Sequence, residues 1–182
     1  MSSEASMVQP RVSQQHFRRA CSKFATGITI LTVDDEAGTP HGMTVNSFTS
    51  VSLDPPLVLV CVDQQTRLMD YLREGIVIGV NVLNEHQQKL STKFARSAQD
   101  RFEGVDWERG PRLGAPILPD VLAALECVIV RVVEGGDHAI CIAEARHVNW
   151  RDGQPLVYFN SGYRALETLA MGDKSANEKT DA

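Results

Sequence analysis

The sequence predicts a mainly β protein, in which an antiparallel sheet closes into a barrel and a few helices pack outside it. Two observations lead to this fold class. Six or seven strand-like stretches come mostly as hairpins and do not alternate with helices, which argues against a parallel βαβ sheet. Only two or three segments show helical spacing. The length of 182 residues suits one domain with its own core.

The first elements are a helix and a β-hairpin. Ser13 is a suitable N-cap. Four apolar residues follow it at helical spacing: Phe17, Ala20, Cys21 and Phe24. We expect Gly27 to end this helix. The β-branched run over residues 28–33 predicts a strand, and turn-forming residues 34–40 join it to a second strand over residues 42–52.

The middle of the chain alternates strands with short helices. Strands are expected over residues 57–62 and 76–83. Thr66 begins a short helix that runs to Arg73, with three apolar residues facing inward. Asn84 and Gln87 have the spacing of a capping box, which predicts a helix to about residue 98.

The second half combines a long irregular stretch with a long hairpin. Residues 100–119 contain three prolines, and stretches of this length in compact domains often cover a functional site. Strands over residues 122–133 and 139–150 are joined by a Gly-Gly-Asp-His turn, and a short strand follows at residues 156–159. We therefore expect a flexible N-terminus over residues 1–12, a domain over 13–170 and a disordered tail over 171–182.

Composition excludes several functional classes. The net charge is −5 and no block of Lys or Arg stands out, so nucleic acid and anionic membranes are not expected partners. No apolar run reaches the roughly 18 residues of a membrane span, and the first ten residues lack a signal-peptide core. We expect a cytoplasmic protein. The four cysteines and five histidines have no metal-ligand spacing, so no metal site is predicted.

The most unusual segment is Thr44 to Ser50, which holds five hydroxyl or amide side chains in seven residues. Buried strands avoid so many short polar groups, because each one removed from water needs a hydrogen-bond partner. Two interpretations stay open from the residues alone. The segment is either a wall for a flat, heteroatom-rich ligand or an exposed edge strand.

Several short motifs resemble those of the flavin reductase family with the FMN-binding split barrel, from about Phe17 to Leu166. The matching pieces are Phe24-Ala25-Thr26-Gly27, Gly42 to Phe48, Ser50 to Leu57, Arg101-Phe102, Gly136-Asp137-His138 and Pro155 to Phe159. Their order and spacing carry the resemblance, which implies an antiparallel split β-barrel. It also implies a homodimer with flavin near the subunit interface, and hydride transfer from NADH, or less often NADPH, to FMN or FAD. Reduced flavin would pass to a partner flavin-dependent monooxygenase.

The resemblance places the flavin ring and ribityl chain along the polar segment. Asn46 and Ser47 are the first candidates for hydrogen bonds, since an amide offers a donor and an acceptor together. Backbone groups of Phe48 and Thr49 share that task. Thr44 and Ser50 are second candidates, expected on the face of Asn46 by the two-residue period of a strand. The alternative for Asn46 is a turn or bulge residue.

The resemblance places Cys61, Val62, Asp63 and Thr66 along the sugar-phosphate side of the flavin. It brings Lys93 and Phe94 near the phosphate or the adenine portion, and makes Arg101 and Phe102 part of a covering on the nicotinamide side. Tyr158 would stack on a ring. Thr66 and the amides after it would hold a phosphate at a helix N-terminus, with charge added by Arg67. Alternatively Thr66 is a simple cap. Lys93 is otherwise a solvated lysine, Phe102 a loop anchor, and Tyr158 a core or interface residue.

His138 is the predicted catalytic residue. It follows a tight turn, where a side chain projects into a cleft, and the family places this histidine beside the nicotinamide. The alternative is an exposed turn histidine. Hydride transfer occurs between the two cofactors, so no catalytic triad is expected. Two other functions stay open: a split-barrel flavoenzyme that retains its flavin and acts on another substrate, or a non-catalytic flavin- or haem-binding module.

Overall fold

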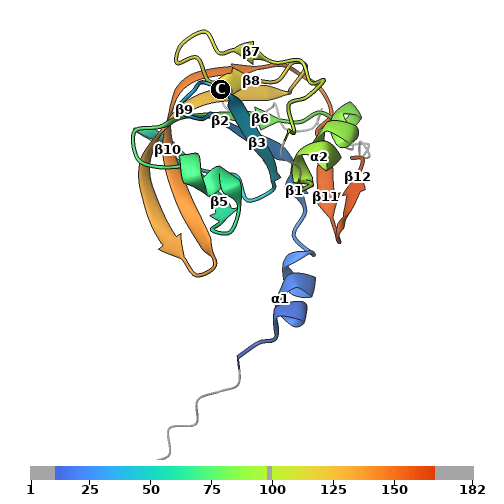
Figure 1. Cartoon of the computed structure of the whole chain (residues 1–182). Coiled ribbons are helices and arrows are strands. Elements are labelled where there is room, and N and C mark those ends of the chain that lie inside the picture. Colours follow the sequence, from blue (N-terminus) through green and yellow to red (C-terminus); the bar gives the residue numbers. More distant parts are fainter. Residues whose placement is uncertain (1–10, 98–99, 167–182) are drawn as a thin grey trace, which may run out of the picture.

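The computed structural model describes residues 11–97 and 100–166 (Figure 1). A seven-stranded antiparallel sheet has the order β3-β2-β6-β9-β10-β5-β4. Its strands are β2 Thr29–Asp34, β3 Pro40–Val45, β4 Thr49–Leu53, β5 Pro56–Asp63, β6 Val77–Val82, β9 Ala123–Gly135 and β10 His138–Trp150. The predicted hairpins are confirmed, because β2 pairs with β3 and β9 pairs with β10.

The two edge strands of this sheet are joined by a very short connection. β3 ends at Val45 and β4 begins at Thr49, at the opposite edge of the sheet. Four peptide steps span at most about 14 Å, so the sheet must curl until its edges nearly meet. No ladder joins β3 to β4 in the described sheet, and this gap splits the barrel. The predicted antiparallel split barrel is therefore confirmed.

One prediction about this region was wrong. Residues 42–52 were expected to form one strand, but residues 46–48 leave the ladder and the chain changes edge there. Both halves carry the alternation of a strand, so sequence periodicity could not show the break. As a result Ser50 does not continue the strand that contains Thr44.

The barrel interior is apolar and contains residues from all its central strands. Leu31, Val33, Val60, Val62 and Val80 are at most 1% exposed and belong to one hydrophobic cluster. A second cluster lies outside the barrel, where Phe94 and Leu118 pack with aromatic residues of the loop and the C-terminal strands. β-branched and leucine side chains fill both, which explains the strand predictions.

Two small sheets complete the β structure. β1 Thr26–Gly27, β11 Val157–Phe159 and β12 Gly162–Arg164 form one of them, and β7 Glu108–Arg109 with β8 Pro116–Ile117 form the other. We call residues 108–118 the strap, because β7, β8 and the turn between them lie over one end of the barrel (Figure 1). The predicted irregular stretch 100–119 thus contains a small hairpin.

Buried polar groups bind the strap to the barrel. The Glu126 carboxylate, 2% exposed, accepts the backbone N–H groups of Arg112 at 2.9 Å, Leu113 at 2.6 Å and Ala115 at 3.3 Å. Asn81 accepts the N–H of Leu118 at 2.9 Å. A buried carboxylate costs much free energy unless it is hydrogen-bonded in this way, so these bonds hold the strap in one position.

The helices are short. They are α1 Gln14–Cys21, η1 Arg67–Tyr71, η2 Glu85–Gln87 and α2 Gln88–Ala95, of which η1 and η2 are 3₁₀ turns. The predicted Ser13 cap and the Asn84–Gln87 capping box are both present. α1 ends six residues before Gly27, which instead belongs to β1, so that predicted helix end was wrong.

α1 lies away from the barrel and buries none of its residues (Figure 1). Phe17, which the periodicity placed on an apolar face, is 62% exposed. In the described residues no helix is long and apolar enough to cross a membrane. The predicted disordered tail, and all but two residues of the predicted flexible N-terminus, lie outside the described residues.

Candidate functional site

A cavity of about 750 Å³ opens beside β3, within the range of cofactor sites. Three chain segments line it: the β2–β3 turn with the start of β3, the end of β5 with η1, and the start of the loop after α2. The lining residues are Thr39, Pro40, His41, Gly42, Asp63, Gln65, Thr66, Arg67, Leu68, Tyr71, Ser97, Asp100, Arg101 and Phe102. The cavity therefore brings together residues up to 63 positions apart in sequence, from Thr39 to Phe102.

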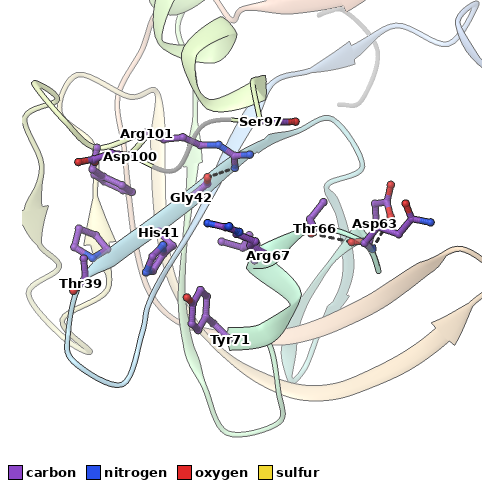
Figure 2. Close-up of a pocket in the computed structure, with 14 residues that line it drawn as sticks. Thr39, His41, Gly42, Asp63, Thr66, Arg67, Tyr71, Ser97, Asp100 and Arg101 are labelled. Carbon is purple, nitrogen blue, oxygen red and sulfur yellow. Dashed lines mark hydrogen bonds between the residues drawn. The ribbon is translucent and has the colours of Figure 1, made fainter.

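Figure 2 shows the order of these side chains along the cavity. Asp63 and Thr66 lie at one end, Thr39 and His41 lie at the other, and Arg67 projects between them. Five residues predicted from the sequence line this cavity: Asp63, Thr66, Arg67, Arg101 and Phe102.

Arg101 joins the loop to the barrel wall. Its Nη1 donates to the carbonyl oxygen of Gly42 at 2.6 Å, and its Nε donates to that of Arg96 at 2.9 Å. Burial lowers the pKa of the guanidinium, which still keeps its charge because its ordinary value lies far above neutral pH. Gly42 is needed here, since a Cβ would lie 2.8 Å from the Phe94 ring.

The predicted helix-terminus site at Thr66 takes a different form. The Thr66 hydroxyl donates to the carbonyl oxygen of Asp63 at 2.8 Å and does not cap η1. η1 is a 3₁₀ turn of five residues, too short for the anion site of a full helix. The Asp63 carboxylate accepts the N–H of Gln65 at 2.8 Å. Thr66 thus stabilises a turn, and its side of the cavity presents Arg67 as the charged group.

Arg67 is a charged cavity residue that is not paired with any described residue. Its side chain is exposed, and among the described residues it has neither an ion pair nor a hydrogen bond. The two cavity carboxylates differ, because Asp63 and Asp100 each accept a backbone N–H. An unpaired guanidinium between walls of polar groups is suited to binding a phosphate.

The sequence analysis missed an aromatic pair at the far end of the cavity. The rings of His41 and Tyr71 are stacked, with centroids 4.5 Å apart and planes 22° apart. His41 Nε2 lies 3.1 Å from the Asp35 carboxylate. No short motif joins His41 to Tyr71, which lie 30 positions apart in the sequence.

The polar segment Thr44–Ser50 lies outside the cavity lining. Ser47 fixes it to β5, since its hydroxyl donates to the Cys61 carbonyl at 2.8 Å and accepts the Cys61 N–H at 3.0 Å. The Thr44 hydroxyl donates to the carbonyl oxygen of Ser91. Asn46 is exposed and its side chain has no hydrogen bond within the described residues. Asn46 therefore has a free donor and acceptor, whereas Ser47 and Thr44 are already paired.

Several predicted side chains cannot face a ligand in the cavity. Val62 and Phe94 are fully buried in the two hydrophobic clusters, so only their backbone groups are left to meet a ligand. Tyr158 packs edge-on against Tyr163, and Phe48 packs against the barrel cluster. Lys93 donates to the carbonyl of Glu103 and does not line the cavity.

The remaining predicted residues stand at other places. Thr49 and Ser50 are exposed on β4, and Cys61 is half-buried on β5. Phe102 lines the cavity and also contacts Phe94 and Trp107 edge-on, at 5.0 and 6.0 Å between ring centroids. Both open interpretations of Phe102, ligand contact and loop anchor, thus have support.

His138 stands next to the cavity at the start of β10. It is the register partner of Asp63, the last residue of β5, and Asp63 lines the cavity. The preceding turn needs Gly136, whose φ is +76°. Gln64 fixes this turn, since its N–H donates to the Asp137 carbonyl at 3.0 Å and its side chain donates to the carbonyls of Gly136 and His138.

The neighbouring carboxylate sets the tautomer of His138. Nδ1 lies 2.7 Å from Asp137 Oδ1, and this hydrogen bond is the main reason why the pKa of Asp137 is lowered. An ionised carboxylate only accepts, so Nδ1 carries the proton. The neutral ring then presents Nε2 as an acceptor, away from Asp137.

In the described part of the chain, the cavity and the polar segment each offer an unpaired polar side chain. Among the described residues no group of three His, Cys, Asp or Glu side chains is placed to hold a metal. The cavity offers the unpaired guanidinium of Arg67, and the polar segment offers the unpaired amide of Asn46. A flavin nucleotide carries a phosphate and a ring edge with donors and acceptors, which these two groups match.

Known proteins resemble this chain over most of its length. An NADH-dependent flavin reductase of Rhodococcus is 37% identical over 177 residues, which cover 95% of this chain and 98% of that protein. The reductase subunit of a flavin-dependent monooxygenase from Rhodococcus jostii is 35% identical over 157 residues, covering 86% of this chain and 80% of that one. The fold matches an NADH:FAD oxidoreductase of Streptomyces globisporus, solved with NAD and FAD fragments, at a TM-score of 0.81.

That structural match has 37% sequence identity and covers 87% of this chain and 95% of the other. The model of the flavin reductase like domain matches residues 21–167, which is most of the sequence. The resemblance predicted from the motifs is confirmed. This chain belongs to the flavin reductase family.

Proposed function

We propose that this protein transfers hydride from NADH to a flavin that exchanges freely, and that the reduced flavin serves a partner monooxygenase. One observation carries the proposal: the register of β10 with β5 brings His138 beside Asp63, at the end of a cavity suited to a nucleotide. A ligand in the cavity would therefore extend toward a histidine that follows a tight turn and whose Nδ1 is bonded to the Asp137 carboxylate. The names of the relatives support the same activity.

The reaction itself belongs to the two ligands. One hydride, with its electron pair, leaves the nicotinamide ring and joins the flavin, and solvent supplies the accompanying proton. The chain's contribution is to bind and orient. His138 Nε2 would accept an N–H of the nicotinamide carboxamide, because its Nδ1 already donates to Asp137.

The flavin would lie between the polar segment and the cavity. Asn46 and the backbone of residues 47–49 face the ring edge, and Arg67 in the cavity pairs with a phosphate. Ser47 acts by holding this backbone in place through its two bonds to Cys61. NADH is the proposed hydride donor, as the name of the Rhodococcus relative gives for that protein. FMN and FAD are both candidate acceptors.

We also propose that the active form is a homodimer. Large apolar side chains are exposed on the single chain, among them Phe24 at 77%, Leu53 at 95% and Trp150 at 74%. α1 also buries none of its residues. These apolar side chains and α1 would become buried against a second copy of the chain. Sedimentation equilibrium should give twice the mass of the chain, and a monomer at micromolar concentration would exclude the dimer. A cytoplasmic location remains our prediction.

The test is NADH oxidation by the purified protein, followed at 340 nm, with and without added FMN or FAD and with NADPH as the comparison. We expect oxidation only when free flavin is present, and faster with NADH than with NADPH. Oxidation without added flavin, by protein that stays yellow through purification, would support a flavoenzyme that retains its flavin. Flavin binding without any oxidation would leave a non-catalytic binding module.

A further inference from the structure

We propose that His41 and Tyr71 form a stacking platform for the adenine of an adenosine diphosphate group, so that the cavity selects dinucleotides over mononucleotides. The inference rests on the proposed function, since it names which ligand that site takes. The two rings line the cavity at the end away from Asp63, which is the register partner of His138 (Figure 2). None of the motifs found in the sequence includes this pair.

The His41–Tyr71 pair is held in one orientation. His41 Nε2 contacts Asp35 Oδ2 at 3.1 Å. The other carboxylate oxygen of Asp35 accepts the N–H groups of Ala37 at 2.9 Å and Thr39 at 2.8 Å, which fixes the β2–β3 turn. These three contacts hold the imidazole in one orientation, and the Tyr71 ring stacks on it.

The two aromatic rings also differ in polarity from the rest of the cavity wall. Most of the cavity wall is polar, whereas His41 and Tyr71 present aromatic rings that are only half-buried. Phe102 also lines the cavity, but Phe94 and Trp107 already contact it edge-on. A half-exposed aromatic pair within a polar cavity matches a ligand with a flat base at the end of a charged chain.

The positive charge of Arg67 lies in the middle of the cavity. Arg67 projects between Asp63 and the aromatic pair (Figure 2), and it has no partner within the described residues. A phosphate held by Arg67 would leave one end of the ligand toward His138 and the other toward His41. A mononucleotide ends at this phosphate, whereas a dinucleotide continues to an adenosine that reaches the platform.

Two ligands carry this adenosine diphosphate group, FAD and NADH, and the experiment separates them. Isothermal titration calorimetry measures FAD and FMN binding to the wild type and to Tyr71→Leu, Tyr71→Phe and His41→Gln. Tyr71→Phe keeps the ring and is the control. Steady-state kinetics with FMN as acceptor then measures the KM for NADH in the same variants.

For FAD as the source, Tyr71→Leu should weaken FAD binding roughly tenfold while FMN binding stays within about twofold, and Tyr71→Phe should restore FAD binding. For NADH as the source, the affinities for FAD and for FMN both stay at the wild-type value and the KM for NADH rises by a similar factor. Equal losses for FAD and FMN would show a purely structural pair and overturn the proposal, as would no change at all. The calorimetric arm is readable even if the protein oxidises no NADH.

Discussion

The strap over residues 108–118 and the cavity beside β3 are both rich in polar groups, but they differ in how those groups are paired. Under the strap, Glu126, Asn81 and Thr32 are at most 2% exposed, and each hydrogen-bonds to the backbone. In the cavity, Arg67 is exposed and has no partner within the described residues. Complete pairing indicates a structural role, whereas a free charged donor beside a concave surface indicates a binding role.

The same contrast applies to the two positions where histidine and carboxylate meet. Asp35 accepts two backbone N–H groups as well as contacting His41, so this pair belongs partly to the fold. Asp137 is 87% exposed at its side chain and contacts His138 alone by its side chain. His138 is thus oriented without being enclosed, which suits a group that meets a ligand arriving from solvent.

The largest effect is expected at the strap. Glu126→Gln should lower the free energy of unfolding by about 3 kcal/mol, because an amide cannot accept all three backbone N–H groups and one donor loses its partner. Urea denaturation followed by circular dichroism measures this. Glu134→Gln, on the exposed end of the same strand, is the matched control and should change stability by less than about 0.5 kcal/mol.

Equal stability of the Glu126 and Glu134 variants would show that the strap is not held by this carboxylate. The strap would then no longer be an example of a region that paired polar groups hold in place.

The next effect concerns the nicotinamide. His138→Ala should raise the KM for NADH about tenfold, while the dissociation constant for flavin stays unchanged, because we propose that the lost Nε2 acceptor contacts only the nicotinamide. Steady-state kinetics and flavin titration measure the two constants. His147→Ala, near the opposite end of β10, serves as control. A His138 variant with the wild-type KM for NADH would remove this residue from the site.

The smallest effect is a difference in thiol reactivity. Burial raises the pKa of Cys127 to about 12, with a further contribution from Glu126, and raises that of Cys141 to about 11. Both thiols should therefore stay protonated at pH 8, and a disulfide reagent should label them only after unfolding. Exposed Cys21 should react in the native protein. Mass spectrometry of labelled peptides identifies the sites, and rapid native labelling of Cys127 would mean that the strap opens easily.

Local features of the fold could be predicted from the sequence, and long-range ones could not. The Ser13 cap, the Asn84–Gln87 capping box and the Gly136 turn each depend on residues within four positions of one another, and all are present. The break at residues 46–48 was missed because the residues on both sides keep a strand pattern. The edge exchange that causes the break is a property of the closed sheet.

Residues of the candidate site could be predicted only where the family resemblance points to them. Asp63, Thr66, Arg101 and Phe102 were found through the family resemblance, and they do line one cavity. Val62 and Phe94 were named through the same resemblance, yet their side chains belong to the two hydrophobic clusters. His41 and Tyr71 meet only because β3 packs beside η1, so no local pattern indicates them.

The central claim is that the unpaired groups of the cavity bind the flavin, and Arg67 tests it most directly. The measurement is the dissociation constant of FAD and of FMN for Arg67→Gln and for Arg73→Gln. Arg73 is the control because it is also exposed, lies just beyond η1 and pairs weakly with Glu36 at 3.8 Å. We expect Arg67→Gln to weaken both flavins about fivefold, or about 1 kcal/mol, with no change for Arg73→Gln. Equal affinity of the Arg67 variant and the wild type would contradict the account.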